Sequence, residues 1–194
     1  MYKKVIKRFF DFIISLMFMP IFGIVFLIVA PLIWLEDGGD VFYEAERRGL
    51  NGKIFKMYKF RSMKMNSPVI ITKDGSTYSA SDDKRLTRIG KILRKTSIDE
   101  LPQFLNVLNG DMSLVGPRPV MPNKKFSELT KTDRKRLSIR PGITGYSQAY
   151  YRNSISQKQK FENDLYYCEN MSLKLDIKIV LKTIESVLMR KNIY

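Results

Sequence analysis

The longest apolar run of the chain covers residues 12–35, which are 24 consecutive residues without a formal charge. As one helix this run would be roughly 36 Å long, enough to cross the hydrocarbon core of a membrane. Pro20, Gly23 and Pro31 interrupt it, and a proline inside a helix removes a hydrogen bond and kinks or breaks the helix. The pattern therefore predicts a membrane-embedded element over residues 1–36, which either breaks at Pro20 or Gly23 or continues as a kinked helix, and a body over residues 37–194.

The charges around this run bear on its topology. Lys3, Lys4, Lys7 and Arg8 precede it, which favours a cytoplasmic N-terminus. Residues 36–194 carry 30 basic and 18 acidic residues, a net charge of +12. A single crossing would export this basic body, whereas a re-entrant segment that returns to its own face would keep it cytoplasmic. Charge and length alone leave both arrangements open.

Beyond the membrane segment, hydrophobic periodicity predicts one hairpin and several helices. Residues 54–60 alternate between apolar and polar side chains, and Leu50-Asn51-Gly52 supplies a turn before them, so a β-hairpin with residues 41–43 is expected. Helices are expected where apolar residues recur at helical spacing, over residues 83–95, 97–108, 124–138 and 172–190.

The remaining segments read as loops, at 65–82, 114–122 and 140–145, because they are polar or rich in proline and glycine. The helices over 83–95 and 172–190 are basic and amphipathic, which is typical of helices at a membrane surface or facing solvent. The predicted fold is α+β and mainly helical, with a small β-hairpin and surface amphipathic helices.

Composition narrows the possible chemistry. The net charge of +15 favours an anionic partner, namely nucleic acid, anionic lipid or a phosphorylated substrate. With no histidine and the single cysteine Cys168, the chain has no internal disulfide, no His-assisted Ser or Cys nucleophile and no His-ligated metal. Acid–base and nucleophilic work then falls to Asp, Glu, Lys, Tyr or Ser, and a metal would take oxygen ligands, as Mg²⁺ does.

The segment Ser97-Ile98-Asp99-Glu100 places two adjacent carboxylates at a predicted helix start. Its spacing is that of a capping box with Ser97 as the N-cap, or else Asp99 is the N-cap and Pro102 lies in the tolerated first turn. The positive end of the helix dipole would stabilise ionised Asp99 and attract a phosphate. An ionised carboxylate can attack phosphorus, and carboxylates near a diphosphate favour Mg²⁺. Asp99 and Glu100 are the candidate catalytic residues, with Asp99 the candidate metal ligand.

A carboxylate that attacks a phosphodiester needs cations to offset the charge repulsion. The stiff loop around Arg118 suits an arginine held in one orientation against phosphate oxygens. Candidate phosphate-binding residues lie after the predicted hairpin, before the dyad and in the proline-rich loops: Lys59, Arg61, Arg94, Arg118 and Arg140.

At these motifs the chain resembles the monotopic phosphoglycosyl transferases, a family of bacterial sugar transferases. The resemblance covers nearly the whole chain and rests on these stretches: KRFFDF at 7–12, RRGLNGKIFKMYKFRSM at 47–63, KRLTRIGKILRKTSIDELPQFLNVLNGDMSLVGPRP at 84–119, RPGITG at 140–145 and KFENDLYY at 160–167.

The resemblance implies that Asp99, paired with Glu100, displaces UMP from a UDP-sugar, and that a polyprenol phosphate then takes the phosphosugar. It implies Mg²⁺ near Asp99 and a re-entrant N-terminal helix at the cytoplasmic face of the bacterial inner membrane. It matches Lys59, Arg61 and Arg118 to family cations. It also assigns the 140–145 loop, with Arg140, Pro141, Gly142 and Thr144, to the nucleotide side of the pocket.

The chain departs from the family in two places. Ile24 stands where many members have a Ser-Pro break in the membrane helix, and residues 146–152 read YSQAYYR where members often have WAQVNGR.

Two other functions are compatible with the charge and the membrane segment. A membrane-anchored binder of anionic lipid or nucleic acid would show salt-sensitive binding without chemistry, and a sugar transferase without phosphate transfer would release UDP. The expected partners are a UDP-sugar, polyprenol phosphate and membrane lipid, and no nucleic acid.

Overall fold

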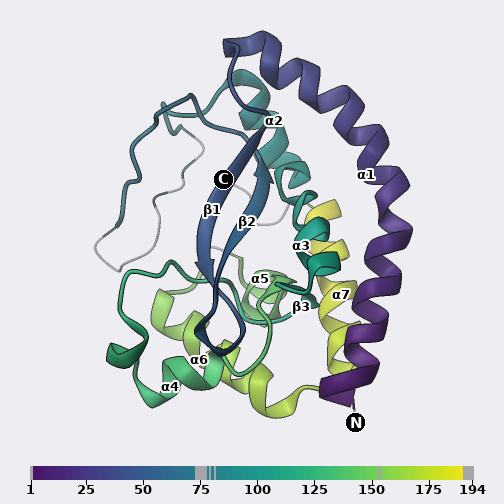
Figure 1. The fold of residues 1–194 in the computed structure, drawn as a ribbon, viewed down its shortest axis with the longest axis vertical. Coiled ribbons are helices and arrows are strands. Elements are labelled where there is room, and N and C mark those ends of the chain that lie inside the picture. The colour runs from purple at the N-terminus through teal and green to yellow at the C-terminus, as the bar shows by residue number, and fades with distance from the viewer. Residues whose placement is uncertain (1, 73–77, 79, 81, 153, 190–194) are drawn as a thin grey trace.

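The computed structural model describes residues 2–72, 78, 80, 82–152 and 154–189. Helix α1 (Lys7–Asp37) follows a π-helical turn at Tyr2–Ile6 and continues through both of its prolines. Of the two forms predicted for this segment, the structure has the continuous kinked helix and no break at Pro20 or Gly23. Figure 1 shows that α1 bends between its purple and its blue half. Pro20 explains a bend, because its ring clashes with the preceding turn and it donates no backbone hydrogen bond.

Among the described residues, α1 is the one helix that is long and apolar enough to cross a membrane. Its inner face packs on the rest of the chain, where Val29 and Ile33 join a buried cluster with Phe60 and Leu93. Its outer face exposes large apolar side chains, with Leu27 at 73% exposure. A helix with this much uncovered apolar surface indicates association with a membrane.

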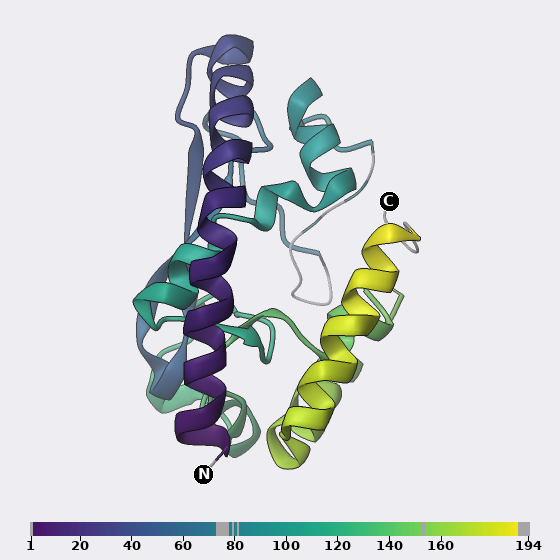
Figure 2. The same cartoon turned by 90° about the vertical axis from the view of Figure 1, so that its right-hand side faces the viewer.

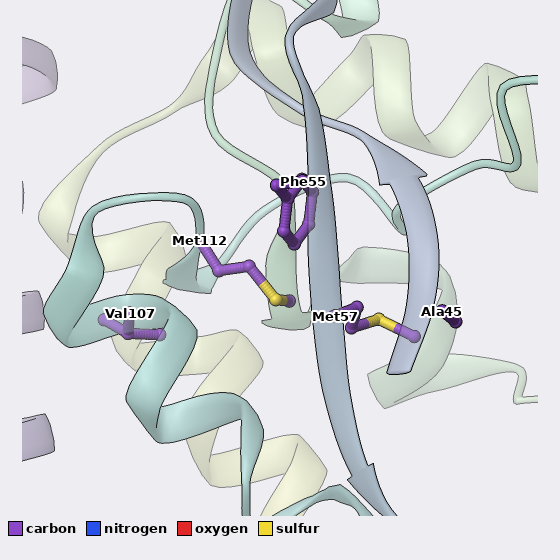
Figure 3. Close-up of a cluster of buried hydrophobic side chains, with 5 residues drawn as sticks. All are labelled: Ala45, Phe55, Met57, Val107 and Met112. Atoms are coloured by element: carbon purple, nitrogen blue, oxygen red, sulfur yellow. The ribbon is translucent and has the colours of Figure 1, made fainter. Parts of the chain in front are cut away.

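The predicted hairpin is confirmed, as strand β1 (Phe42–Arg48) pairs antiparallel with β2 (Ile54–Phe60). The turn between them contains Asn51 at φ 52° and Gly52 at φ 83°, backbone conformations that asparagine and glycine tolerate best. Alternation along β2 sends Phe55 and Met57 into a cluster with three other buried residues (Figure 3), which are Ala45, Val107 and Met112.

The other regular elements of the described residues are helices, apart from two short strands, so the α+β, mainly helical prediction is confirmed. Strands β3 (Ser113–Val115) and β4 (Gly142–Thr144) pair in parallel. The helices are α2 (Arg88–Thr96), α3 (Gln103–Asn109), α4 (Lys131–Arg136), α5 (Tyr146–Tyr150), α6 (Gln157–Asn170) and α7 (Leu173–Leu188). In Figure 2 the yellow α7 begins near the N-terminal end of α1, and the two helices diverge from that point.

Three predicted helices are shorter than expected. The helix predicted at 83–95 begins at Arg88, because the Thr87 side chain caps it by accepting from the Gly90 N–H. The helix predicted at 97–108 consists of a 3₁₀ turn, Ile98–Glu100, and the separate helix α3. The helix predicted at 124–138 consists of a 3₁₀ turn, Phe126–Glu128, and α4. The predicted helix at 172–190 is confirmed to Leu188, and residue 190 lies outside the described residues, as do 73–77, 79 and 81 of the predicted loop.

Candidate active site

Asp99 and Glu100 lie in a 3₁₀ turn, Ile98–Glu100, between α2 and α3. The capping-box prediction is wrong, because Ser97 has φ 59° and its side chain makes no capping hydrogen bond. Its backbone N–H instead closes the end of α2 by donating to the Arg94 carbonyl. Asp99 is not the N-cap either, since α3 begins only after Pro102. The dyad therefore lies at a junction between two helices rather than at a helix start.

The carboxyl group of Asp99 is buried, with the residue only 7% exposed. This burial raises its pKa to about 6, and the neighbouring Glu100 pushes it in the same direction, while Lys59 and Arg94 act against the rise. Among the described residues, no side chain is seen donating a hydrogen bond to Asp99. A buried carboxylate whose charge is only partly compensated is poised to act as a nucleophile or to take a cation.

Glu100 has a different environment, because its carboxylate accepts a hydrogen bond from the Lys59 ammonium at 2.6 Å. Burial alone would raise the pKa of Glu100, but the positive charges of Lys59, Arg118 and Arg152 outweigh it and lower the pKa below its ordinary value. The two adjacent carboxyls thus differ in basicity and can carry different roles.

The position of Lys59 depends on a buried amide that the sequence pattern did not single out. Asn106 of α3 is fully buried, and its side chain accepts from the Tyr58 N–H at 2.9 Å and donates to the Lys56 carbonyl at 2.7 Å. These two bonds imitate a neighbouring strand along the edge of β2. They fix the hairpin against α3 and so hold Lys59 beside Glu100. The only available signal was an asparagine inside an apolar helix pattern.

The predicted phosphate-binding residues separate into two groups. Lys59 and Arg94 lie at the dyad, where Arg94 also donates to the Ser62 hydroxyl at 3.0 Å, and Arg118, exposed in its loop, acts on Glu100. Arg61 is turned to the end of α1. Its guanidinium binds both carboxylate oxygens of Asp37, at 2.6 and 2.5 Å.

The predicted nucleotide loop, residues 140–145, is hydrogen-bonded to the loop that carries Arg118. Gly116 donates its N–H to the Thr144 carbonyl, and Gly142 donates to the Pro117 carbonyl. A Cβ atom on Gly142 would lie 2.1 Å from the Gly116 nitrogen, so only glycine allows this approach. The Pro141 carbonyl accepts from the Ser113 N–H.

The polar side chains of that loop are also engaged within the protein. Arg140 donates to the Gly110 carbonyl at 2.8 Å, and the Thr144 hydroxyl lies 2.7 Å from that of Thr183. The loop predicted to be turn-rich is strand β4, and the nucleotide role of Arg140, Pro141, Gly142 and Thr144 stays a prediction.

Arg152 is a site residue that the charge pattern did not select. It lies close enough to lower the pKa of Glu100. It follows a group of tyrosines in which Tyr146 stacks on Tyr150 with ring centroids 4.7 Å apart. This group occupies the segment, 146–152, that departs from the family pattern, so the departure lies close to the dyad in space.

The dyad also fits the predicted Mg²⁺. Mg²⁺ commonly binds through one or two carboxylates and completes its octahedron with substrate phosphates and water. Asp99 offers a desolvated carboxylate and Glu100 a second oxygen donor beside it. In the described part of the chain, no three Asp, Glu or Cys side chains gather into a metal cluster.

The raised pKa of Asp99 has a consequence for stability. The carboxyl is harder to ionise folded, at a pKa of about 6, than unfolded, at 3.8. Its charge therefore destabilises the folded state above pH 6 and has no effect below pH 4. Asp99→Asn should stabilise the protein by on the order of 2–3 kcal/mol above pH 6. Thermal melts in EDTA from pH 4 to 8 measure the gain, and a pH-independent difference would contradict the assignment.

Comparison with known proteins places the chain in a family. The model of the bacterial sugar transferase family matches residues 2–190. The chain is 40% identical over 189 residues to an uncharacterized sugar transferase, EpsL, of Bacillus subtilis, which covers 97% of this chain and 90% of that protein.

Two further relatives have more specific names. One is the UDP-N-acetylgalactosamine-undecaprenyl-phosphate N-acetylgalactosaminephosphotransferase of Aeromonas hydrophila, 41% identical over 94% of this chain and 44% of that protein. The other is the UDP-glucose:undecaprenyl-phosphate glucose-1-phosphate transferase of Escherichia coli, 36% identical over 98% of this chain and 42% of that protein. The chain thus spans less than half the length of these two relatives.

The exposed apolar helix indicates a membrane-associated protein, and the buried carboxyl among basic residues fits a site for an anionic substrate. The chain belongs to the bacterial sugar transferase family.

Proposed function

We propose that this protein transfers a sugar 1-phosphate from a UDP-sugar to undecaprenyl phosphate and releases UMP. The observation that carries the proposal is the buried carboxyl of Asp99, held beside Glu100 among Lys59, Arg94 and Arg118. The names of the relatives from Aeromonas hydrophila and Escherichia coli support this reaction class. Membership in a family of transferases speaks against a binder without chemistry.

In the first step a carboxylate oxygen of Asp99 attacks the β-phosphorus of the UDP-sugar. The bond from that phosphorus to the bridging oxygen breaks, and UMP leaves with the electron pair. Lys59 and Arg94 supply positive charge beside Asp99 and Arg118 supplies it beside Glu100, where they offset the repulsion between carboxylate and diphosphate. Mg²⁺ bound at Asp99 and Glu100 would neutralise charge on the diphosphate oxygens.

In the second step a phosphate oxygen of undecaprenyl phosphate attacks the phosphorus held by Asp99. The acyl phosphate bond breaks, the Asp99 carboxylate is restored, and the phosphosugar becomes part of a polyprenyl diphosphate. Glu100 keeps its negative charge through the ion pair with Lys59. We assign Glu100 to placing the cation, because a carboxylate that stays ionised attracts a cation and its lowered pKa makes it a weak base.

We also propose that α1 is re-entrant and that the body lies at the cytoplasmic face of the bacterial inner membrane. Both ends of α1 are tied to the same body: Lys7 forms a buried ion pair with Asp176 of α7, and Asp37 pairs with Arg61. A helix that crossed the membrane would have its ends on opposite sides. The apolar residues Leu181 and Leu188 of α7 are also exposed, which suits an interfacial helix.

The products of the first step test the reaction class. The full chain in lipid nanodiscs, given Mg²⁺, undecaprenyl phosphate and a panel of UDP-sugars, should release UMP with at least one donor. Release of UDP would instead assign transfer of the sugar without its phosphate. Without undecaprenyl phosphate, UMP release should stop near one equivalent per protein, because the phosphosugar stays on Asp99. Absence of any nucleotide product across the panel would contradict the proposal.

A further inference from the structure

The last two residues of α1 are acids that bind two different parts of the body. The carboxylate of Glu36 accepts backbone N–H groups of α2, from Arg88 at 2.5 Å and from Ile89 at 3.0 Å. The carboxylate of Asp37 accepts two hydrogen bonds from the guanidinium of Arg61. We call these contacts the α1 clamp, and the chemistry proposed above uses neither acid.

The Glu36 contact completes the capping of α2. The first N–H groups of a helix have no partner within it. The Thr87 hydroxyl accepts from the N–H of Gly90, and the Glu36 carboxylate accepts from the N–H groups of Arg88 and Ile89. A negative charge at this end also interacts favourably with the helix dipole. Glu36 therefore fixes where α2 begins relative to the end of the membrane helix.

The Asp37 contact fixes the exit of β2 in the same way. The Arg61 side chain is only 6% exposed, and besides Asp37 it donates to the carbonyls of Asp40 and Met63. A planar guanidinium with this many fixed acceptors has one orientation. Arg61 follows Lys59 by two residues, so the α1 clamp binds the chain two residues after the cation that pairs with Glu100.

Both clamped elements lead directly to the dyad. Helix α2 carries Arg94 and ends three residues before Asp99, and β2 carries Lys59. The Arg94 guanidinium donates to Ser62, beside Arg61, and so ties the two elements together. The end of α1 thus contacts both elements that carry the cations acting on Asp99.

We propose that Glu36 and Asp37 are positioning residues, which carry the placement of the membrane helix to the cations of the dyad. The inference rests on the proposed function, because its readout is the transfer reaction. The α1 clamp is polar and borders an open cavity of about 490 Å³, which is lined in part by Glu36, Asp37 and Arg88. The cluster of Val29, Ile33, Phe60 and Leu93 keeps α1 attached without the clamp. Loss of the clamp therefore shifts the cations without unfolding the chain.

The test uses Glu36→Ala and Asp37→Asn of the full chain in nanodiscs, with Glu169→Gln as the matched control. Glu169 is also an exposed acid in an ion pair, with Lys135, far from the dyad in the chain. We expect kcat for UMP release to fall about tenfold, since small misplacements of catalytic groups have effects of this size or larger. KM for the UDP-sugar should stay within about twofold, and the control should match wild type.

A conservative variant separates positioning from general stability. Asp37→Glu keeps a carboxylate that can accept from Arg61, so it should retain most of the kcat that Asp37→Asn loses, at the same melting temperature. An unchanged kcat in Glu36→Ala and Asp37→Asn would overturn the inference, as would a loss in Asp37→Asn that follows the melting temperature and that Asp37→Glu shares. Failure of wild type to release UMP would instead contradict the proposed function.

Discussion

Asp99→Asn should abolish UMP release, lowering turnover by at least about 10³-fold, as loss of a catalytic nucleophile does in other enzymes. Asparagine has nearly the shape of aspartate but no anionic oxygen, so it cannot form the acyl phosphate. The measurement is initial UMP release from the preferred UDP-sugar, with and without undecaprenyl phosphate. Mass spectrometry of the protein should show a phosphosugar adduct on wild type and none on the variant.

Two controls make this result specific. Asp99→Asn should melt at a higher temperature than wild type at pH 8, because it removes a buried charge, so its inactivity cannot come from unfolding. Asp111→Asn changes an acid of the same type outside the dyad, where it lies 3.7 Å from Lys53, and should keep near-normal turnover. Turnover by Asp99→Asn within tenfold of wild type would rule out Asp99 as the nucleophile.

Local patterns predicted the parts of the fold that local forces determine. The hairpin was predictable because alternation and the Asn51-Gly52 turn act over a few residues. Helix α7 was predictable because its apolar residues repeat over four turns. The same periodicity did not show which of these apolar residues are exposed, as Leu181 and Leu188 are, and which are buried, as Ile179 is, because that depends on what covers the helix.

The backbone around the dyad was not predictable from local spacing. Ser97 has the spacing of an N-cap, but it ends the helix before it in a left-handed conformation. Strand β4 looked like a turn because RPGITG is rich in glycine and proline, yet its glycine allows close contact with Gly116, 26 residues earlier. Partners this distant in the chain, like Asp37 for Arg61, leave no local signal.

Arg136→Met should strongly destabilise the protein, because it removes one partner of a buried ion pair between two helices. Arg136 of α4 and Asp164 of α6 form an ion pair with side chains 3% and 2% exposed, 2.6 Å apart. The guanidinium also stacks over the ring of Phe161 at 3.8 Å. Removing one partner leaves a buried charge uncompensated, which costs about 3–5 kcal/mol. The melting temperature should fall by about ten degrees, measured by thermal unfolding of the purified protein.

The same ion pair also anchors the loop that carries Arg118, so its removal should lower turnover as well as stability. Asp164 accepts the backbone N–H of Arg118, and Arg136 reaches the Arg118 carbonyl. The double variant Arg136→Met with Asp164→Leu should regain most of the stability, because apolar side chains of similar size replace the pair. It should not regain turnover, because Arg118 has lost both anchors beside Glu100.

The control is Lys135→Met, which removes an exposed pair between the same two helices and should cost under about 1 kcal/mol. Recovery of turnover together with stability would show that the pair acts only on folding.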